Sequence, residues 1–213
     1  MPLPPSRVEG HPHFKGARQV PDTTKLDLLD DLLAHQRAIR KFTNDPLDDA
    51  LIERVLRAAT RAPSARNVQP WRFIVIRDRE TKQQLGAIFD ELGARLYGQG
   101  APDRTPWEDV PVLVAVCSEY AFGEGEAAMT ALGASIYPAV QNLLLAAQAA
   151  GLGAVLTTRW KSREPQLRPL LGLPETMAVH AIIPMGWPDR GYGKNGRRPV
   201  AEVTYRERLG QPW

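Results

Sequence analysis

Residues 127–158 read AAMTALGASIYPAVQNLLLAAQAAGLGAVLTT and contain no charged side chain. The stretch predicts a helix from Glu126 to Ala150, which is about 37 Å long at ~1.5 Å per residue. Because this helix is apolar on nearly every side, it must be buried along most of its surface. Small residues near its start, including Ala131 and Gly133, permit close approach of another helix. A helix this apolar in a domain of this size suggests that a subunit interface covers part of it.

The same stretch has to be weighed as a membrane span, which needs about 20 consecutive apolar residues. Polar side chains and a proline interrupt it at Thr130, Ser135, Pro138, Gln141, Asn142 and Gln148, and Gly151-Leu-Gly153 breaks it further. These interruptions favour a core helix that ends at Gly151 and leads into a buried strand from Ala154 to Thr158.

The flanking sequence supplies further helices and strands. Apolar residues at helical spacing predict one helix around Leu26–Leu33 and a second one, capped by Asp48, that continues to Ala59. The other predicted elements are a strand at Trp71–Arg77, a helix at Glu80–Tyr97, a strand at Val110–Ser118, a short helix at Pro165–Leu171 and a strand at Ala178–Met185. No internal repeat is visible, so we expect one α+β domain at residues 25–213 after a loose, proline-rich arm at residues 1–24.

Charge and cysteine content argue against several classes of protein. The 213 residues include 27 Lys and Arg against 24 Asp and Glu, largely interleaved, whereas nucleic-acid-binding proteins usually gather their positive excess on one face. The single cysteine, Cys117, cannot form an intrachain disulfide and stands in an apolar run, so we expect a small buried hydrophobe. His11 and His13 have no third ligand nearby, and no metal site is predicted. The lack of a signal-like apolar segment and the cysteine content favour a cytoplasmic location.

Two basic segments could bind an anion. Arg37-Ala-Ile-Arg40-Lys41 places two arginines three residues apart just after a helix, and Arg197-Arg198 forms a pair near the C-terminus. The planar guanidinium group makes paired, charge-assisted hydrogen bonds to phosphate oxygens, so the first two arginines could converge on one dianion. The alternative is that each segment is an exposed, solvated basic turn.

A polar loop follows the second predicted helix and reads Ala62-Pro-Ser-Ala-Arg-Asn67-Val-Gln69-Pro-Trp71. Its prolines restrict the backbone, and the amide side chains of Asn67 and Gln69 offer both donors and acceptors. The edge of a flavin pyrimidine ring requires both kinds of partner. The alternative is a structural loop whose amides satisfy backbone groups.

These segments together resemble the FMN-dependent nitroreductase family. The family's Arg-Ser-Ile-Arg-Arg-Phe motif is matched by Arg37–Phe42, and its Ala-Pro-Ser-x-x-Asn-x-Gln-Pro-Trp motif is matched by Ala62–Trp71. The pattern continues with Gln-Asn-Leu-Leu-Leu-Ala-Ala at Gln141–Ala147, Gly-Leu-Gly at Gly151–Gly153 and a basic pair before Pro199. Each motif alone is weak, but five of them in the family's order, over roughly residues 26–208, make a strong resemblance.

The resemblance implies an α+β fold with a mixed sheet flanked by helices, a homodimer formed through the long central helix, and two FMN molecules at the subunit interface. It also implies roles for individual residues. Arg37 and Arg40, joined by Arg197 and Arg198, would hold the FMN phosphate; Asn67 and Gln69 would meet the flavin ring; Pro63 and Ser64 would lie along the ring from the other subunit; and Leu156, Thr157 and Thr158 would line its far side.

Two positions depart from the family's pattern. Many members have serine where Ala38 stands, so one hydrogen bond to the phosphate is missing here or comes from a backbone amide. Gln36 stands where some members have another arginine. These departures leave the FMN prediction in place but weaken any prediction of phosphate geometry.

The implied reaction has two halves. NAD(P)H delivers hydride to flavin N5, and a small electron-poor acceptor such as a nitroaromatic, a quinone or a free flavin then takes the reducing equivalents. Because the cofactor carries this chemistry, no residue of the chain is predicted as a catalytic acid or base. The loop from Gly98 to Asp109, which contains Trp107, is a candidate lid over the ring, with an ordinary surface loop as the alternative.

Other functions stay open at this point. Relatives on the same scaffold break down reduced flavin with oxygen or remove halogen from an aromatic ring. A flavin-binding sensor or store would bind the cofactor without turnover. A basic nucleic-acid-binding domain would use Arg37, Arg40, Lys41 and the pair Arg197-Arg198. The physiological acceptor and the choice between NADH and NADPH cannot be predicted from these residues.

Overall fold

The computed structural model describes residues 23–98, 103–120, 123, 125–158 and 160–213. Most of the predicted N-terminal arm, with His11 and His13, lies outside the described residues. In chain order the elements are α1 (Thr24–His35), α2 (Asp49–Ala59), η1 (Ala65–Asn67), β1 (Trp71–Ile76), α3 (Arg79–Tyr97), η3 (Trp107–Asp109), β2 (Val112–Glu119), α4 (Glu126–Ala149), β3 (Gly153–Ala154), η4 (Trp160–Arg163), α5 (Glu164–Leu171), β4 (Met177–Gly186) and η5 (Val200–Glu202).

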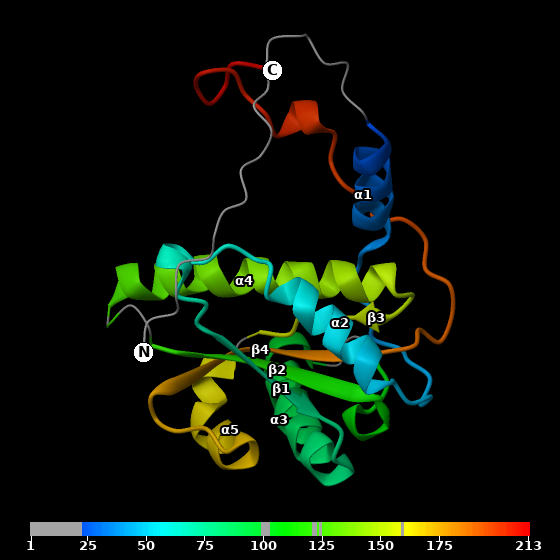
Figure 1. Ribbon diagram of the computed structural model, residues 1–213, viewed down its shortest axis with the longest axis vertical. Helices are drawn as coiled ribbons and strands as arrows, with labels where there is room; N and C mark the ends of the chain where they lie inside the picture. The colour runs from blue at the N-terminus through cyan, green and yellow to red at the C-terminus, as the bar shows by residue number, and fades with distance from the viewer. Residues whose placement is uncertain (1–22, 99–102, 121–122, 124, 159) are drawn as a thin grey trace, which may run out of the picture.

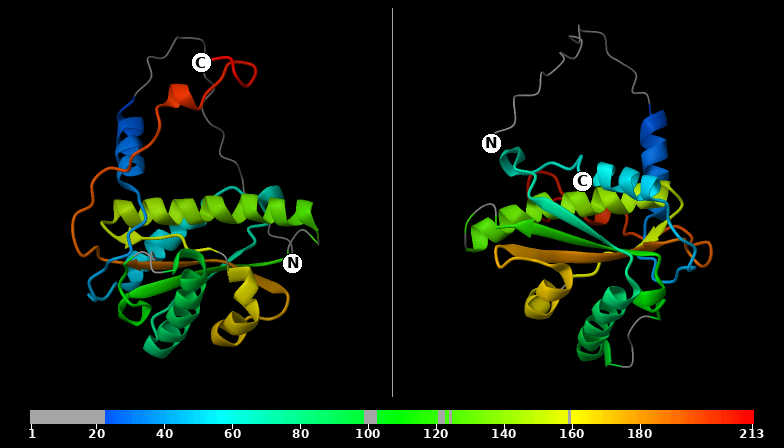
Figure 2. Two further views of the ribbon diagram at one scale, coloured as in Figure 1. Left: turned by 180° about the vertical axis from the view of Figure 1, so that it is seen from behind. Right: turned by 60° about the horizontal axis from the view of Figure 1, so that its bottom comes forward.

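A four-stranded sheet in the order β1-β2-β4-β3 forms the middle layer. The pairs β1–β2, β2–β4 and β3–β4 are all antiparallel. A parallel bridge joins Ala38 to Ala154 at the β3 end, and this bridge brings the basic segment against the sheet. Helices α2 and α4 cover one face, while α3 and α5 cover the other (Figures 1 and 2). The predicted α+β architecture is therefore confirmed.

The central strand β2 is apolar throughout because both of its faces are covered. Val112, Val114 and Val116 belong to the core cluster that includes α2 and α4. Leu113 and Cys117 belong to the second cluster, which includes α3 and α5. Cys117 is fully buried, as predicted, and burial followed by the Glu164 charge raises the pKa of its thiol to about 12.

Helix α4 is the long core helix that the charge-free stretch predicts. Eight of its residues are buried, and none of the described helices is both long and apolar enough to cross a bilayer. Beyond Gly151, which has a φ of +77°, the chain turns back into β3. Gly153 must be glycine there, because a Cβ atom would lie 2.6 Å from Cγ2 of Ile39.

Two predictions about loops and strands are corrected. The strand expected at Ala154–Thr158 is only two residues long, and Thr157 joins the sheet through a single bridge to Ile182. Trp107, placed in a candidate lid, is 2% exposed and stacks on Phe89 with ring centroids 4.7 Å apart. A side chain buried in this way anchors its loop, and residues 99–102 of the proposed lid lie outside the described residues.

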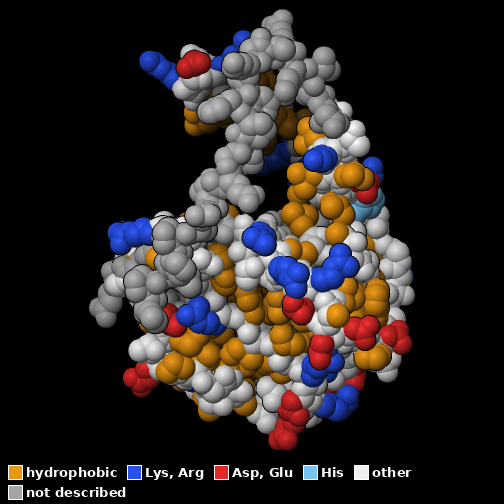
Figure 3. Space-filling model, in the orientation of Figure 1, with side chains coloured by type: hydrophobic (Ala, Val, Ile, Leu, Met, Phe, Trp, Pro, Cys, Tyr) orange, Lys and Arg blue, Asp and Glu red, His pale blue; other side chains and the backbone are white. Residues whose placement is uncertain are grey.

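Helix α1 and the C-terminal segment stand away from the layered body (Figure 1). The predicted helix is present, but none of its residues is buried, and four of its five leucines are 42–65% exposed. Figure 3 shows hydrophobic side chains along α1. Exposed apolar residues continue in the C-terminal segment, where Leu209 is 86% and Trp213 69% exposed. An exposed apolar surface of this kind favours coverage by another protein surface.

Candidate active site

The basic segment after α1 runs along β3. The backbone N–H of Ile39 donates to the Ala154 carbonyl at 3.1 Å, and the Ile39 side chain is buried. This contact fixes the segment while Arg37, Ala38 and Arg40 remain exposed. Among the described residues, neither arginine takes part in an ion pair. Both guanidinium groups therefore remain available to an anion.

The C-terminal segment is held beside Arg37 by Asn195. Its backbone N–H donates to the Ala34 carbonyl at 2.7 Å, and its Nδ2 donates to the carbonyls of Leu33 and Gln36 at 2.8 Å each. These bonds satisfy carbonyl groups at the end of α1, which have no partner within the helix. Arg37 Nη1 also donates to the Gly193 carbonyl at 3.2 Å.

Because of this attachment, Arg197 and Arg198 follow within three residues of a point fixed to α1. Both are exposed, and Arg197 Nη1 donates to the neighbouring Gly196 carbonyl at 2.8 Å. The structure thus brings the two predicted basic segments to one end of the molecule. Asn195 itself was missed from sequence, where its position between two glycines was the only available signal.

The polar loop Ala62–Trp71, which carries the amide side chains of Asn67 and Gln69 and is called the amide loop from here on, has a strained backbone. Arg66, Asn67 and Gln69 have φ values of 53°, 55° and 52°, in the left-handed region that residues other than glycine rarely adopt. Each such residue costs on the order of 1–3 kcal/mol and persists only where the surroundings hold it. Ser64 Oγ accepts from the Gln69 backbone N–H at 3.0 Å, and Ser135 Oγ of α4 accepts from the Ala65 N–H at 3.2 Å. Strain maintained by specific bonds is typical of functional loops.

The two amide side chains of this loop lie together. Gln69 Nε2 donates to Oδ1 of Asn67 at 3.3 Å and to its carbonyl at 3.4 Å. Asn67 and Pro63 are exposed, while Ser64 and Gln69 are half-buried. Pro63, Ser64, Asn67 and Gln69 share one short loop, which favours all four acting from the same subunit rather than Pro63 and Ser64 alone acting from the other one.

Within one chain, the amide loop lies far from the basic end, meaning the end of the molecule that carries Arg37–Lys41 and Arg197-Arg198. The loop is attached at Ser135, and β3, with the basic segment, follows the C-terminal end of α4 at Ala149. Fourteen residues of helix separate these points, which corresponds to about 21 Å at ~1.5 Å per residue. Figure 1 shows the loop over one half of α4 and β3 beside the opposite, C-terminal end. The two predicted parts of the site are therefore not brought together in a single chain.

The segment Leu156–Thr158, which was predicted to line the flavin, turns two side chains outward and one inward. Leu156 is 38% exposed and Thr158 is exposed. Thr157 is buried, with Oγ1 donating to the Ile182 carbonyl. Trp160 Nε1 donates to the Thr157 carbonyl at 3.1 Å and approaches Thr157 Oγ1 at 3.3 Å. Leu156 and Thr158 can therefore face a ligand, whereas Thr157 holds the segment in place.

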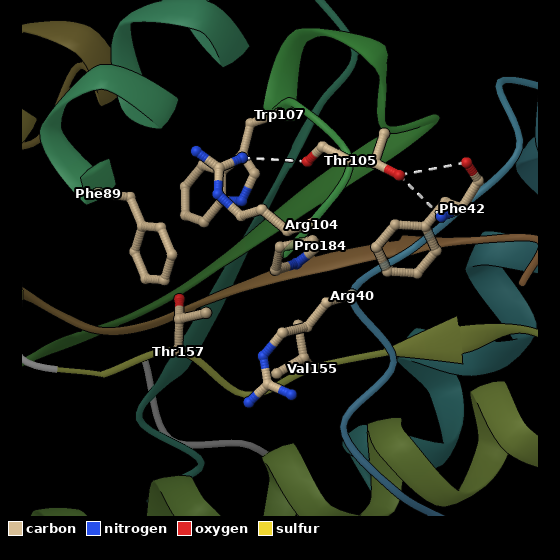
Figure 4. Close-up of a pocket in the computed structure, with 9 residues that line it drawn as sticks. All are labelled: Arg40, Phe42, Phe89, Arg104, Thr105, Trp107, Val155, Thr157 and Pro184. Carbon is tan, nitrogen blue, oxygen red and sulfur yellow. Dashed lines mark hydrogen bonds between the residues drawn. The ribbon is translucent and has the colours of Figure 1, made fainter. Parts of the chain in front are cut away.

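A small pocket lies between this segment and the aromatic side chains of Phe89 and Trp107 (Figure 4). It has room for roughly one water molecule, at about 20 Å³, and its lining includes Arg40 and Arg104. In Figure 4, Arg40 lies beside Val155 and Arg104 lies beside Trp107. Arg104 is paired with Asp90 at 2.5 Å and its side chain is 15% exposed. Sequence reasoning missed Arg104 because it treated this region as a lid.

Metal-ligating side chains do not gather anywhere in the described part of the chain. The donors beside β3 and in the C-terminal segment are exposed guanidinium groups, which suit a phosphate. The amide loop suits the polar edge of a heterocycle. The chemistry of both parts fits FMN, provided that the two parts come from different copies of the chain.

This chain is similar in sequence to proteins that have already been named. A protein of Archaeoglobus fulgidus, whose name pairs NADH dehydrogenase with NAD(P)H nitroreductase, is 34% identical over 155 residues, covering 72% of this chain and 81% of that protein. Iodotyrosine deiodinase 1 of Rattus norvegicus is 30% identical over 178 residues, covering 76% of this chain and 62% of that protein.

Solved structures with this fold include flavin proteins. A protein of Desulfovibrio desulfuricans named as a nitroreductase, in complex with FMN, is 30% identical with a TM-score of 0.68, covering 85% of this chain and 97% of that one. The NADPH:FMN oxidoreductase of Vibrio harveyi, complexed with NAD⁺, is 26% identical with a TM-score of 0.68, covering 86% of this chain and 78% of that one. The model of the Nitroreductase family matches residues 33–187. This chain therefore belongs to the nitroreductase family.

Proposed function

We propose that this protein is a homodimeric, FMN-dependent oxidoreductase that takes hydride from NAD(P)H and passes it to a small electron-poor acceptor. Family membership supports the reaction class. The names of the relatives support the cofactor and the donor, since one was solved with FMN and another is a NADPH:FMN oxidoreductase. The observation that carries the proposal is the exposed arginine cluster at the end of α1, whose members take part in no ion pair among the described residues and to which Asn195 ties the C-terminal segment.

The arginine cluster would bind the FMN phosphate. Arg37 and Arg40 would approach it from the segment beside β3, and Arg197 and Arg198 would approach it from the C-terminal segment. A phosphate carries close to two negative charges at neutral pH, and paired guanidinium groups match its oxygens. Ala38 has no hydroxyl group, so any hydrogen bond from that position would come from its backbone N–H.

The flavin ring would lie between two subunits. Leu156 and Thr158 of one subunit would form one wall, and Thr157, held by the Nε1–H of Trp160, would keep that wall in position. Pro63, Ser64, Asn67 and Gln69 of the partner would approach the ring and its polar edge. The separation of about 21 Å along α4 within one chain supports this division, because one subunit cannot bring both parts to one ring.

FMN supplies the hydride chemistry when it is bound. The chain's own contribution is to neutralise the phosphate, to offer amide donors and acceptors to the ring edge, and to exclude water from the ring with apolar side chains such as Leu156. Among the described residues, none is placed as a proton donor or acceptor for the reaction. Catalysis here depends on binding and orientation.

The exposed apolar surfaces support the homodimer. The leucines of α1 and the residues Leu209 and Trp213 would each leave apolar area in water if the chain stayed monomeric. Burial of such area contributes about 25 cal/mol per Å². A second copy could cover these surfaces and deliver its amide loop in the same arrangement.

Reductive dehalogenation is a second candidate on the same site. The similarity to iodotyrosine deiodinase 1, at 30% identity, is the observation that favours it. A halogenated phenol would then be the acceptor, and halide would be released. Release of iodide from an iodinated phenol by the reduced protein, without reduction of a nitroaromatic, would select this candidate.

The first test is the visible spectrum of the purified protein. The proposal predicts a yellow protein that NADH or NADPH bleaches under anaerobic conditions and that a nitroaromatic or quinone then restores. Bleaching with no acceptor that restores the colour would indicate a sensor or store. A colourless dimer that takes up no added FMN would refute the proposal, and salt-sensitive retention of DNA by such a protein would indicate nucleic-acid binding.

A further inference from the structure

The loop of residues 189–198 carries more positive charge than one FMN phosphate requires. This basic loop contains Arg190, Lys194, Arg197 and Arg198, with Asp189 as its one acid. Among the described residues, none of these four cations takes part in an ion pair. Asp189 accepts from the Tyr192 hydroxyl at 2.8 Å, and its single negative charge leaves the loop positive overall.

The basic loop is fixed to the body at both ends. The backbone N–H of Asp189 donates to the Lys41 carbonyl at 3.2 Å, and Asn195 is bonded to the end of α1. Between these points the guanidinium of Arg190 lies over the Tyr192 ring at 5.3 Å, and that of Arg37 lies over the same ring at 5.8 Å. An exposed cation held over a ring loses less freedom on binding an anion than a free side chain does.

Charge balance indicates that this part of the molecule can bind a second anion. The proposed FMN phosphate has about two negative charges, and Arg37, Arg40, Arg197 and Arg198 already outnumber them. Arg190 and Lys194 remain beside this site as two further exposed cations. We infer that Arg190 and Lys194 form a second phosphate-binding site, which takes the 2′-phosphate of NADPH and makes NADPH the preferred electron donor.

The inference rests on the proposed function, because it assigns the substrate of that site. NADPH and NADH differ only in the 2′-phosphate, a dianion at neutral pH. A pair of cations that binds this group favours NADPH and leaves NADH almost unaffected. Tyr192 is a positioning residue for Arg190, because its ring lies under the guanidinium and its hydroxyl is tied to Asp189.

The first experiment measures kcat/KM for NADPH and NADH with FMN-saturated protein. The unaltered chain should prefer NADPH at least tenfold. The double variant Arg190→Gln/Lys194→Gln should lose at least tenfold with NADPH and less than twofold with NADH. Arg54→Gln, which removes one exposed charge from α2, is the control and should change neither value. Equal use of both donors, or an equal loss with both in the double variant, would overturn the inference.

A binding experiment separates this inference from the proposed function. Calorimetric titration of FMN-saturated protein should show adenosine 2′,5′-bisphosphate binding at least tenfold more tightly than 5′-AMP, and the double variant should remove the difference. Equal binding of the two nucleotides by a protein that NADH and NADPH both bleach would refute the 2′-phosphate site alone. A protein that neither donor bleaches would refute the proposed function instead, and tight bisphosphate binding would then still support the second phosphate site.

Discussion

Replacing Gly153 with alanine should damage both stability and cofactor binding. A Cβ atom at this position would lie 2.6 Å from Cγ2 and 2.8 Å from Cβ of Ile39, and 3.2 Å from the Phe42 ring. Ile39 is 3% exposed and is bonded to Ala154, so it cannot move away without disturbing the sheet. Overpacking of this kind costs typically about 1–3 kcal/mol.

The consequence for function follows from the neighbours of Ile39. Arg37 and Arg40 stand two residues before and one residue after it, so any shift of Ile39 moves both guanidinium groups. Gly153→Ala should therefore unfold about 1–3 kcal/mol more easily in urea, with an unchanged m-value. In a domain of this size the melting temperature should fall by roughly 2–4 °C per kcal/mol. The dissociation constant for FMN should rise at least tenfold.

Gly93→Ala is the matched control for this substitution. Gly93 lies within α3, and a Cβ atom there would have no heavy atom within 4 Å. Alanine in a helix interior is favoured over glycine by about 0.5–1 kcal/mol, so this variant should be slightly more stable and should bind FMN normally. If Gly153→Ala retained the stability and FMN affinity of the parent protein, the close approach of β3 to the basic segment could not be what positions the arginines.

Three further predictions concern single side chains. Arg37→Glu should weaken FMN binding more than tenfold, since it places a negative charge beside the phosphate, while the urea midpoint stays within error; a variant that purifies fully yellow would argue against the phosphate assignment. Asn195→Ala removes the two Nδ2 hydrogen bonds to the carbonyls of Leu33 and Gln36 and should weaken FMN binding by loosening the C-terminal segment, as measured by flavin fluorescence; unchanged affinity would show that the attachment is not needed. Burial raises the pKa of the Cys117 thiol from 9.0 to about 12 in the folded chain, so its contribution to stability is complete below pH 9 and is lost as pH rises toward 12. Cys117→Ala should therefore flatten the fall in the free energy of urea unfolding across this range. An equally steep fall in the variant would contradict the role of the buried thiol.

Sequence alone predicted the elements that a strong periodicity or an uninterrupted apolar run defines. The helix at α4 and the strand at β2 were expected within a few residues of their bounds because both are buried on most sides. The amide loop was located from Asn67 and Gln69, although its left-handed backbone was not foreseen. Glycine would normally mark such φ values, and this loop instead uses the bonds to Ser64 and Ser135.

Long-range contacts could not be predicted in this way. Trp107 stood among prolines and polar residues, which is typical of a surface loop, yet stacking on Phe89 places it in the core. Asn195 and Arg104 act through partners far away in the sequence, at the end of α1 and at Asp90. The apolar pattern of α1 indicated a packed helix, and the structure leaves four of its five leucines exposed. In that case the pattern reports an apolar face but does not identify its partner.

A subunit-mixing measurement tests the central claim most directly, because each flavin site should need two copies of the chain. Arg37→Glu alters the basic end, and Asn67→Asp, which suits the left-handed backbone, alters the amide loop. Each variant alone should bind FMN poorly. Differently tagged subunits that are co-expressed and purified as a mixed dimer should recover one tightly bound FMN per dimer, since one site then carries both changes and the other carries none. A mixed dimer that binds no more FMN than either parent would contradict the shared site.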